Sequence, residues 1–322
     1  MEKIVTTACS TCYCGCGVLA HVEDGTALII KGDPEHPYSQ GALCPRGYSA
    51  LELLYHPNRL NYPMQRVGER GEGKWQRISW DEALSTIANK LNKTKEQYGP
   101  EANSISAGAW MYGNTGITAH FGSLIGTPNW VNLTHICFGP MATATSVTIG
   151  YYAGINITET VSDEVLASSC ILLWGANPRA SAPYPVGEGI FDVKEKGTKL
   201  IVVDPRLTDY AKEADIWLQI RPGTDDALAL GMINVIINEN LYDKKFVDEW
   251  CFGFEELKDR VNEYPPEKVS KITWIPESDI EKAARMFAIT KPSCLCQRVS
   301  LDQSYNSVQS SRATLILTAI CG

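Results

Sequence analysis

The chain has 322 residues, of which 44% are hydrophobic and 20% are charged, and its net charge is -8. This balance is ordinary for a globular protein, and the length exceeds what one hydrophobic core usually serves, so we expect two or three domains. The acidic excess argues against nucleic-acid binding, because no surplus of Lys and Arg is present to neutralise phosphates. No run of about 18 apolar residues occurs, so no membrane-spanning helix is expected.

The eleven cysteines are the most informative part of the composition. The first residues include neither an apolar signal segment nor a twin-arginine pair, which makes a cytoplasmic location the default expectation. In that compartment cysteines serve as metal ligands or thiols rather than in disulfides. Four of the eleven lie between Cys9 and Cys16, a density that packing alone does not explain.

The first 60 residues form a small unit that carries these cysteines. Their β-branched content predicts short strands at 4–7, 18–22 and 27–31, with a hairpin turn at 23–25. So few apolar residues make a weak core, and small domains of this kind commonly need a metal to hold them together.

The cysteine spacing favours an iron–sulfur cluster. Cys9, Cys12 and Cys16 are close in sequence and Cys44 is remote, which is the usual arrangement of cluster ligands. On spacing alone Cys14 can replace Cys12 or Cys16. Zinc is the alternative, although a zinc site more often presents two symmetrical pairs, and Cys44 has no partner nearby.

The chain changes character after this unit. Pro63 and three glycines make residues 61–75 a linker or extended crossing. A capping box at Ser79–Glu82 predicts a helix that Gly99 ends. A short buried strand is expected at 104–107, and the glycine-rich run 107–126 is typical of a loop followed by a helix.

From about residue 137 the pattern becomes strand, loop, helix. Continuous apolar runs predict parallel strands that are buried on both faces: 170–174, 199–203 and 216–220. The helix over 227–237 is apolar nearly all round and therefore buried. A second capping box at Ser278–Glu281 predicts the start of another helix.

Three loops follow these strands, and ligands of open parallel sheets bind outside the carboxyl ends of the strands. The loops are Gly175–Pro178, Asp204–Arg206 and Pro222–Asp225. Glycine lets the backbone approach a phosphate, Asp accepts from a sugar or base, and the fork of Arg206 suits a phosphate. None is a dinucleotide or Walker motif, so an ordinary NAD or ATP site is not supported. The plainer reading is that they are turns and helix caps.

The later cysteines are isolated. Cys137 stands alone, and a lone cysteine is usually a small core residue. Cys170 and Cys251 are flanked by apolar residues and are interpreted as structural. The remaining three show no informative spacing: Cys294, Cys296 and Cys321.

In combination, these motifs resemble those of the molybdenum/tungsten bis-molybdopterin guanine dinucleotide oxidoreductases, the DMSO reductase superfamily. Its members include formate dehydrogenases, nitrate reductases, polysulfide or thiosulfate reductases and acetylene hydratases. Besides the cysteine pattern that ends in Cys44-Pro45-Arg46-Gly47, four stretches carry the resemblance: Ile78–Leu84, Trp174–Pro178, Val203–Arg206 and Pro222–Asp225.

The resemblance implies an α/β fold with a small N-terminal β-rich iron–sulfur domain at 1–60. Rossmann-like αβα domains with parallel sheets would follow. Residues 61–136 would form the first part of the αβα domain with the active-site loop, and 137–322 would bind the pterin dinucleotide. Members of this family continue well past 322 residues into a domain that closes over the second pterin, so a fragment or a split-gene product is expected.

The resemblance also implies cofactors and their ligands. A [4Fe–4S] cluster would sit on Cys9, Cys12, Cys16 and Cys44, and Cys137 would ligate molybdenum or tungsten. Arg46 lies where the family often has Lys between cluster and pterin. Nine residues fall in stretches that bind the bis-molybdopterin guanine dinucleotide: Trp174, Gly175, Asn177, Pro178, Asp204, Arg206, Gly223, Thr224 and Asp225.

The implied function is that of an oxidoreductase catalytic subunit, or a portion of one. A small-molecule substrate would exchange two electrons or an oxygen atom with the metal beside Cys137. Electrons would pass Arg46 and the cluster to a partner protein or subunit. His135, Trp110 and His120 are candidates to face the substrate.

Two alternative functions remain. Stretches 126–130 and 231–257 resemble the acetylene hydratases, which would make the chain a non-redox tungsten enzyme. The catalytic Asp of those enzymes follows the second cluster cysteine, however, and here that residue is Tyr13, which cannot act as a carboxylic acid with a raised pKa. The other alternative is an electron-carrying subunit that holds the cluster but no pterin metal.

Overall fold

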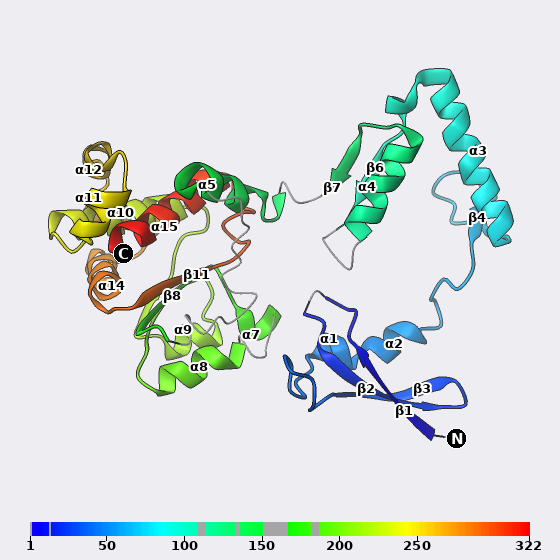
Figure 1. Ribbon diagram of the computed structural model, residues 1–322, viewed down its shortest axis with the longest axis horizontal. Helices are drawn as coiled ribbons and strands as arrows, with labels where there is room; N and C mark the ends of the chain where they lie inside the picture. The colour runs from blue at the N-terminus through cyan, green and yellow to red at the C-terminus, as the bar shows by residue number, and fades with distance from the viewer. Residues whose placement is uncertain (1, 13, 109–113, 133–135, 151–166, 182–186) are drawn as a thin grey trace. The chain divides into compact units, whose positions relative to one another are not determined.

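The computed structural model (Figure 1) describes residues 2–12, 14–108, 114–132, 136–150, 167–181 and 187–322. The chain divides into two compact units, 1–134 and 135–322. Within the described ranges, none of the helices has the length and apolar character that crossing a membrane requires.

The first unit begins with an antiparallel sheet of three strands in the order β1-β2-β3. They span Glu2–Ala8, Gly17–Glu23 and Thr26–Gly32, and each contains one of the strands predicted for this unit. Asp24 and Gly25 connect β2 to β3 with φ values of 48° and 82°. Positive φ at both positions gives the tight turn that suits the twist of a hairpin.

Two short helices and a second hairpin follow. Helices α1 (Pro45–Tyr48) and α2 (Ala50–Leu54) come directly after Cys44. Strands β4 (Met64–Arg66) and β5 (Trp75–Arg77) then pair antiparallel. The expectation of a linker or extended crossing at 61–75 therefore missed the pairing of these two strands. These strands are exposed and three residues long, too short for an alternating pattern to reveal them.

The rest of the first unit is a helix and a small parallel pair. Helix α3 (Trp80–Tyr98) begins as predicted, with Glu82 N–H donating to Ser79 Oγ at 3.1 Å. A single 3-10 turn, η1 (Pro100–Ala102), precedes β6 (Ile105–Ala107), and α4 (Asn114–Ile125) and β7 (Trp130–Asn132) complete the unit. Strands β6 and β7 are parallel. The sequence predicts a buried strand here, whereas β6 is only partly buried.

The second unit is built on a parallel sheet of four strands in the order β10-β9-β8-β11. In chain order they are β8 (Cys170–Trp174), β9 (Lys199–Val203), β10 (Ile216–Leu218) and β11 (Ser293–Gln297). The third predicted strand is thus two residues shorter than expected, and β11 was not predicted. Its Cys-Leu-Cys centre lacks the β-branched residues that mark strands.

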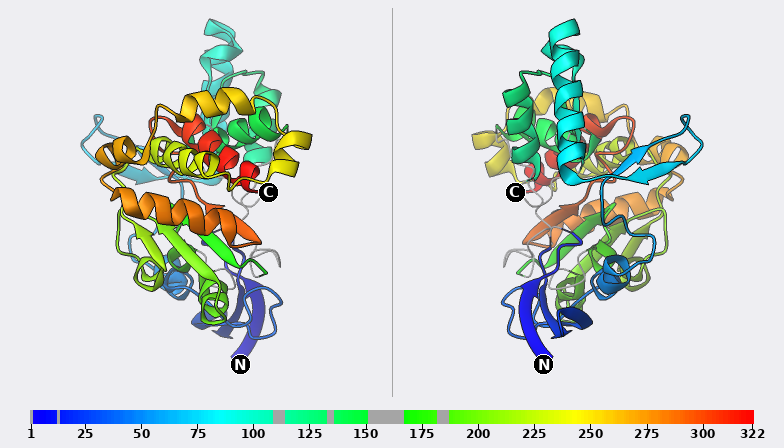
Figure 2. Two further views of the ribbon diagram at one scale, coloured as in Figure 1. Left: turned by 90° about the vertical axis from the view of Figure 1, so that its left-hand side faces the viewer. Right: turned by 90° about the vertical axis from the view of Figure 1, so that its right-hand side faces the viewer.

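Helices cover both faces of this sheet. Successive side chains of β8 point to opposite faces, and those on each face pack against helices. Ile171 and Leu173 pack with α8 (Glu188–Glu195) and α9 (Asp209–Glu213). Leu172 packs on the other side with α10 (Asp225–Asn238), α14 (Glu277–Ile289) and α15 (Ser307–Cys321). Figure 2 shows α14, drawn in orange, across this face. The predicted αβα arrangement is confirmed.

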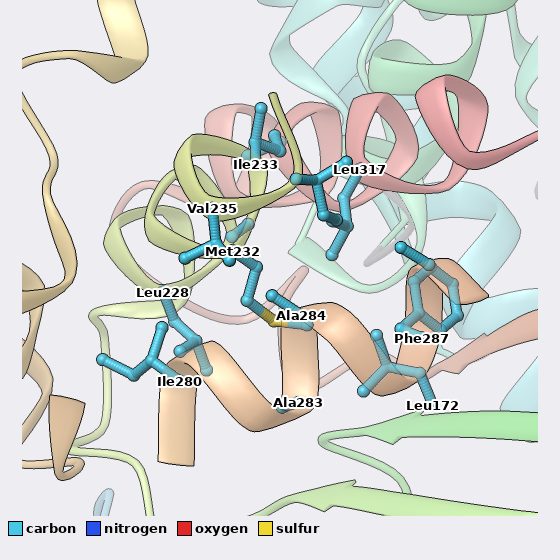
Figure 3. Close-up of a cluster of buried hydrophobic side chains, with 14 of the residues drawn as sticks. Leu172, Leu228, Met232, Ile233, Val235, Ile280, Ala283, Ala284, Phe287 and Leu317 are labelled. Atoms are coloured by element: carbon cyan, nitrogen blue, oxygen red, sulfur yellow. The ribbon is translucent and has the colours of Figure 1, made fainter. Parts of the chain in front are cut away.

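Figure 3 shows the centre of the larger core, where Met232 of α10 meets side chains from α14 and α15. Ten residues of α10 are buried, as its apolar sequence predicts. The capping prediction for α14 was wrong: the helix begins at Glu277 after Pro276, whose side chain has no acceptor. The described part of this unit contains five further helices: α5 (Gly139–Ile149), α7 (Pro178–Ser181), α11 (Lys244–Trp250), α12 (Phe254–Val261) and α13 (Pro266–Thr273).

The two units differ in how much core they contain. Among the described residues, Val18 is the one buried hydrophobic side chain of the first unit. The other buried hydrophobic residues lie between Met141 and Cys321, in the second unit. The sequence-based expectation of a weak core in the cysteine unit therefore holds in the structure.

Candidate cluster and cofactor site

The loop between β1 and β2 carries four of the five clustered cysteines. It is closed at its base by Cys9 N–H, which donates to the Cys16 carbonyl at 2.8 Å. The closure continues the pairing of β1 with β2, in which Ala8 faces Gly17. Cys12 and Cys14 lie in the loop that this closure defines, and Tyr13 lies outside the described residues.

The segment after β3 folds back against the start of β2 and brings Cys44 toward the loop. Gly17 N–H donates to Ser39 Oγ at 3.0 Å, and Asp33 N–H donates to the Gly17 carbonyl at 3.0 Å. Only glycine fits at this approach: a Cβ on Gly17 would lie 2.4 Å from the His36 side chain. The segment after β3 can therefore pack this closely against β2 only because Gly17 has no side chain.

The thiols of the loop interact electrostatically. Burial raises the pKa of Cys16, and the charges of Cys12, Cys9 and Cys44 raise it further. Burial and then the neighbouring Cys12 raise the pKa of Cys14 to about 12. Thiols that influence one another in this way lie close together, as the spacing predicts.

Cys44 differs from the other thiols. Burial raises its pKa, but hydrogen bonds from the Gly47 N–H and from the side chain and backbone of Arg46 outweigh this effect, so the pKa falls below its usual range. The hydrogen bond to Cys44 in turn raises the pKa of Arg46. Cys44 therefore loses its proton more readily than an ordinary cysteine, and thiolate is the form that binds metals.

Zinc ions and iron–sulfur clusters place different geometric demands on their thiolate ligands. Across the described part of the chain, no three His, Cys, Asp or Glu side chains converge as ligands of one metal ion. Zinc needs four ligands around a single point. In a [4Fe–4S] cluster each thiolate binds a different iron, so the sulfurs are held further apart.

Cys137 belongs to the second unit. It lies half-buried in the turn that precedes α5, whose first backbone hydrogen bond runs from Ala142 N–H to the Phe138 carbonyl at 2.9 Å. Of the three candidates to face a substrate, Trp110 and His135 lie outside the described residues, and His120 is exposed on α4.

The three predicted loops meet at the carboxyl edge of the parallel sheet. Trp174 Nε1 donates to Asp225 Oδ1 at 2.8 Å, which joins the end of β8 to the start of α10. Gly175 N–H donates to the Val203 carbonyl at 2.8 Å, which joins the ends of β8 and β9. Burial raises the pKa of Asp225, against the effect of the Trp174 hydrogen bond.

Asp204 and Arg206 occupy the loop after β9 in different environments. Asp204 is buried and accepts from the Arg206 N–H at 2.8 Å, while its own carbonyl accepts from Trp217 Nε1 at 2.9 Å. The Arg206 side chain is 73% exposed, with Nε 3.5 Å from Asp204 Oδ1. The buried carboxylate thus orders the loop, and the guanidinium is available to an anion.

A cavity of about 470 Å³ opens beside this loop. Prolines and two indoles make up much of its wall, and such flat groups can pack against a planar ring. Its lining residues are Pro205, Trp217, Gln219, Ile220, Pro222, Trp274, Ile275 and Pro276.

The end of β11 adds residues to this edge that the sequence did not reveal. Strand β8 lies between β9 and β11, so the chain leaves β8 toward one side and returns on the other. This is a topological switch point, where such sheets bind ligands. Here Ser300 Oγ donates to the Gly175 carbonyl at 2.6 Å. The sequence did offer one indication of strand β11, namely the short apolar run from Cys294 to Cys296 after Pro292.

Asp302, which follows β11 in the chain, contacts the start of α5. Its Oδ1 accepts from the Met141 N–H at 2.6 Å. Burial raises the pKa of Asp302 to about 6, although the Met141 hydrogen bond opposes the shift. The segment after β11 therefore contacts both the Gly175 loop and the helix that follows Cys137.

Comparison with known proteins agrees with this architecture. Residues 2–56 match the family model of the molybdopterin oxidoreductase Fe4S4 domain, and residues 59–317 match that of molybdopterin oxidoreductase. Acetylene hydratase from Syntrophotalea acetylenica is 42% identical over 98% of this chain and 42% of its own length. Formate dehydrogenase H from Escherichia coli is 33% identical over 100% of this chain and 45% of its own.

A solved structure, acetylene hydratase from Pelobacter acetylenicus, superposes with a TM-score of 0.82 and 40% identity. The match covers 98% of this chain and 43% of that structure. The chain thus spans less than half the length of these relatives.

Proposed function

Because this chain belongs to the molybdopterin oxidoreductase family, we propose that it forms part of the catalytic subunit of a molybdenum or tungsten oxidoreductase. The observation that carries the proposal is the set of interacting thiols in the region that matches the Fe4S4 domain model. The reaction would be two-electron or oxygen-atom transfer to or from a small-molecule substrate.

The cluster would be held by Cys9, Cys12, Cys16 and Cys44, and Cys14 would have no ligand role. A [4Fe–4S] cluster supplies one-electron transfer, and its potential depends on nearby charge and hydrogen bonds. Arg46 hydrogen-bonds to Cys44, so its positive charge would favour the more negative, reduced state of the cluster. This effect would support electron flow toward the cluster.

Cys137 would ligate molybdenum or tungsten, since a soft thiolate suits such a metal. The pterin dinucleotide would lie along the carboxyl edge of the sheet. Asp204 is a buried acceptor there, Asp225 is a half-buried one, and Arg206 is an exposed cation. The remaining contacts would come from Trp174, Gly175, Asn177, Pro178, Gly223 and Thr224. The adjacent cavity would take the guanine ring.

The electrons would leave through a partner protein or a further subunit. A cytoplasmic location also belongs to the proposal. It is supported by the eleven cysteines, none of which is in a disulfide although all lie in the described part of the chain.

Metal analysis and EPR of anaerobically purified, reduced protein test the proposal. We expect about four irons per chain with a [4Fe–4S] signal, together with molybdenum or tungsten. A Cys16→Ser variant should lose the cluster, whereas the matched variant Cys14→Ser, in the same loop, should retain it. Retention of the signal in a Cys9→Ser/Cys44→Ser double variant would refute the ligand assignment.

A non-redox hydratase is the second candidate, because 42% identity to acetylene hydratase covers nearly the whole chain. Tyr13 in place of a carboxylic acid argues against it. Addition of water to acetylene without any electron acceptor would favour this function over the redox reaction. Iron without molybdenum or tungsten would instead indicate an electron-carrying subunit.

A further inference from the structure

The first turn of α5, which follows Cys137, has no cap of its own. Phe138 occupies the N-cap position, and its side chain contains no hydrogen-bond acceptor. Pro140 has no N–H, so Met141 carries the next backbone donor. The first turn also contains no acidic residue. A buried helix that begins in this way needs an acceptor from elsewhere in the molecule.

Asp302 supplies this acceptor from 161 residues further along the chain. Its Oδ1 accepts from the Met141 N–H at 2.6 Å, and the residue is only 4% exposed. A carboxylate is favoured at a helix N-terminus by the helix dipole, and hydrogen bonds to a charged acceptor are short and strong. The bond therefore fixes the start of α5 to the segment after β11.

A second contact holds the same residue of α5. Gln297, at the end of β11, donates from Nε2 to Met141 Sδ at 3.0 Å. Its Oε1 accepts from Thr314 Oγ1 of α15 at 2.5 Å. Leu301, beside Asp302, is 1% exposed in the larger core. Met141 is therefore held at its backbone and its side chain by a segment that is itself fixed.

We propose that Asp302 is a positioning residue for Cys137: by capping α5, it holds the turn that presents the thiol. The proposal rests on the proposed function, in which Cys137 ligates the metal. Cys137 lies two residues before α5 begins, so movement of the first turn displaces the thiol. Binding constellations must be held within about 0.5 Å of their productive geometry, which gives such displacement a chemical consequence.

The reactivity of Cys137 in the metal-free full chain tests this proposal. Alkylation by iodoacetamide can be followed site by site with mass spectrometry. We expect Asp302→Ala to accelerate alkylation of Cys137 about fivefold, which corresponds to the roughly 1 kcal/mol that a helix cap contributes. Asp302→Asn retains a neutral acceptor and should give an intermediate increase of about twofold.

A matched control distinguishes positioning from general stability. Asp243 caps α11, where its Oδ1 accepts from the Phe246 N–H at 2.8 Å. We expect Asp243→Ala to lower the melting temperature but leave alkylation of Cys137 unchanged. If Asp302→Ala behaved in the same way, Asp302 would be a helix cap only. If Asp302→Ala did not fold, Asp302→Asn would decide, and no increase in its rate would overturn the proposal.

The proposed function can fail separately from this inference. A Cys137→Ala variant that kept its molybdenum or tungsten with an unchanged EPR signal would refute Cys137 as the metal ligand. The alkylation measurement requires no bound metal, so it reports on Asp302 independently.

Discussion

Single residues decide how Cys44 reaches the other thiols. Strand β3 ends at Gly32, where a Cβ would lie 1.9 Å from the Gly41 carbonyl oxygen. No side chain fits at that distance, so any larger residue must push the returning segment away. The segment between β3 and Cys44 would then change its path.

We expect Gly32→Ala to reduce the free energy of unfolding by about 1–3 kcal/mol, as overpacking does, and to lower the iron content per chain. Gly116→Ala is a suitable control, because a Cβ there meets no atom within 4 Å. It lies within α4, where Ala is favoured over Gly by up to about 1 kcal/mol. Thermal unfolding and iron analysis measure both effects, and full iron content in Gly32→Ala would contradict the steric argument.

The buried carboxyl of Asp302 makes stability depend on pH. Its folded pKa of about 6 lies above the value near 3.9 of an unfolded Asp. The folded state therefore binds the proton more tightly, and the contribution is full below about pH 4 and lost as pH rises through about 6. Relative to Asp302→Asn, the wild type should lose up to about 3 kcal/mol across this range.

Urea unfolding of both proteins at several pH values between 4 and 8 measures this loss. The difference between the two proteins isolates Asp302, because the other titrating groups are common to both. Parallel curves would show that Asp302 titrates with an ordinary pKa.

At the scale of elements, the sequence predicts well what is buried on both sides. Strands β8 and β9 and helix α10 are enclosed by apolar neighbours, so most of their own residues are apolar and easy to recognise. The exposed hairpin of β4 and β5 has no such requirement and was missed. The start of α14 was misassigned because a Ser-x-x-Glu pattern is common, and Pro276 instead fixes the entry to that helix.

Helix α10 offers a direct measure of core packing. Met232 is fully buried among α14 and α15, so Met232→Ala should cost about 2–5 kcal/mol of unfolding free energy. Met232→Leu conserves volume and should cost less than about 1.5 kcal/mol. Denaturant unfolding compares the two, and equal losses would mean that shape rather than volume governs this site.

Across the whole molecule, stability is divided unequally between the two units. The second has a continuous core, whereas the described part of the first buries a single hydrophobic side chain, Val18. The spacing of the N-terminal cysteines predicts cluster ligands that are close in sequence. The bond between Asp302 and Met141 is not, because nothing in either local sequence signals a partner 161 residues away.

Removal of the cluster should therefore unfold one unit and spare the other. After oxidation and chelation of the iron, we expect amide protection in β1, β2 and β3 to fall to nearly that of an unfolded chain. Protection in β8, β9 and α10 should not change. Hydrogen exchange with mass spectrometry reports both units in one sample, and retained protection in the first sheet would show that it is stable without metal.

The strand order of the second unit has a consequence for biosynthesis. Strand β8 can pair with β9 soon after both leave the ribosome, but its other edge waits for β11, whose Ser293 pairs with Cys170. At about 5–20 residues per second, translation of the intervening segment takes roughly 6–25 seconds. During that time the nascent chain exposes an apolar strand edge, a template for aggregation. A chaperone that shields this edge would raise the yield of folded protein that can accept its cofactors.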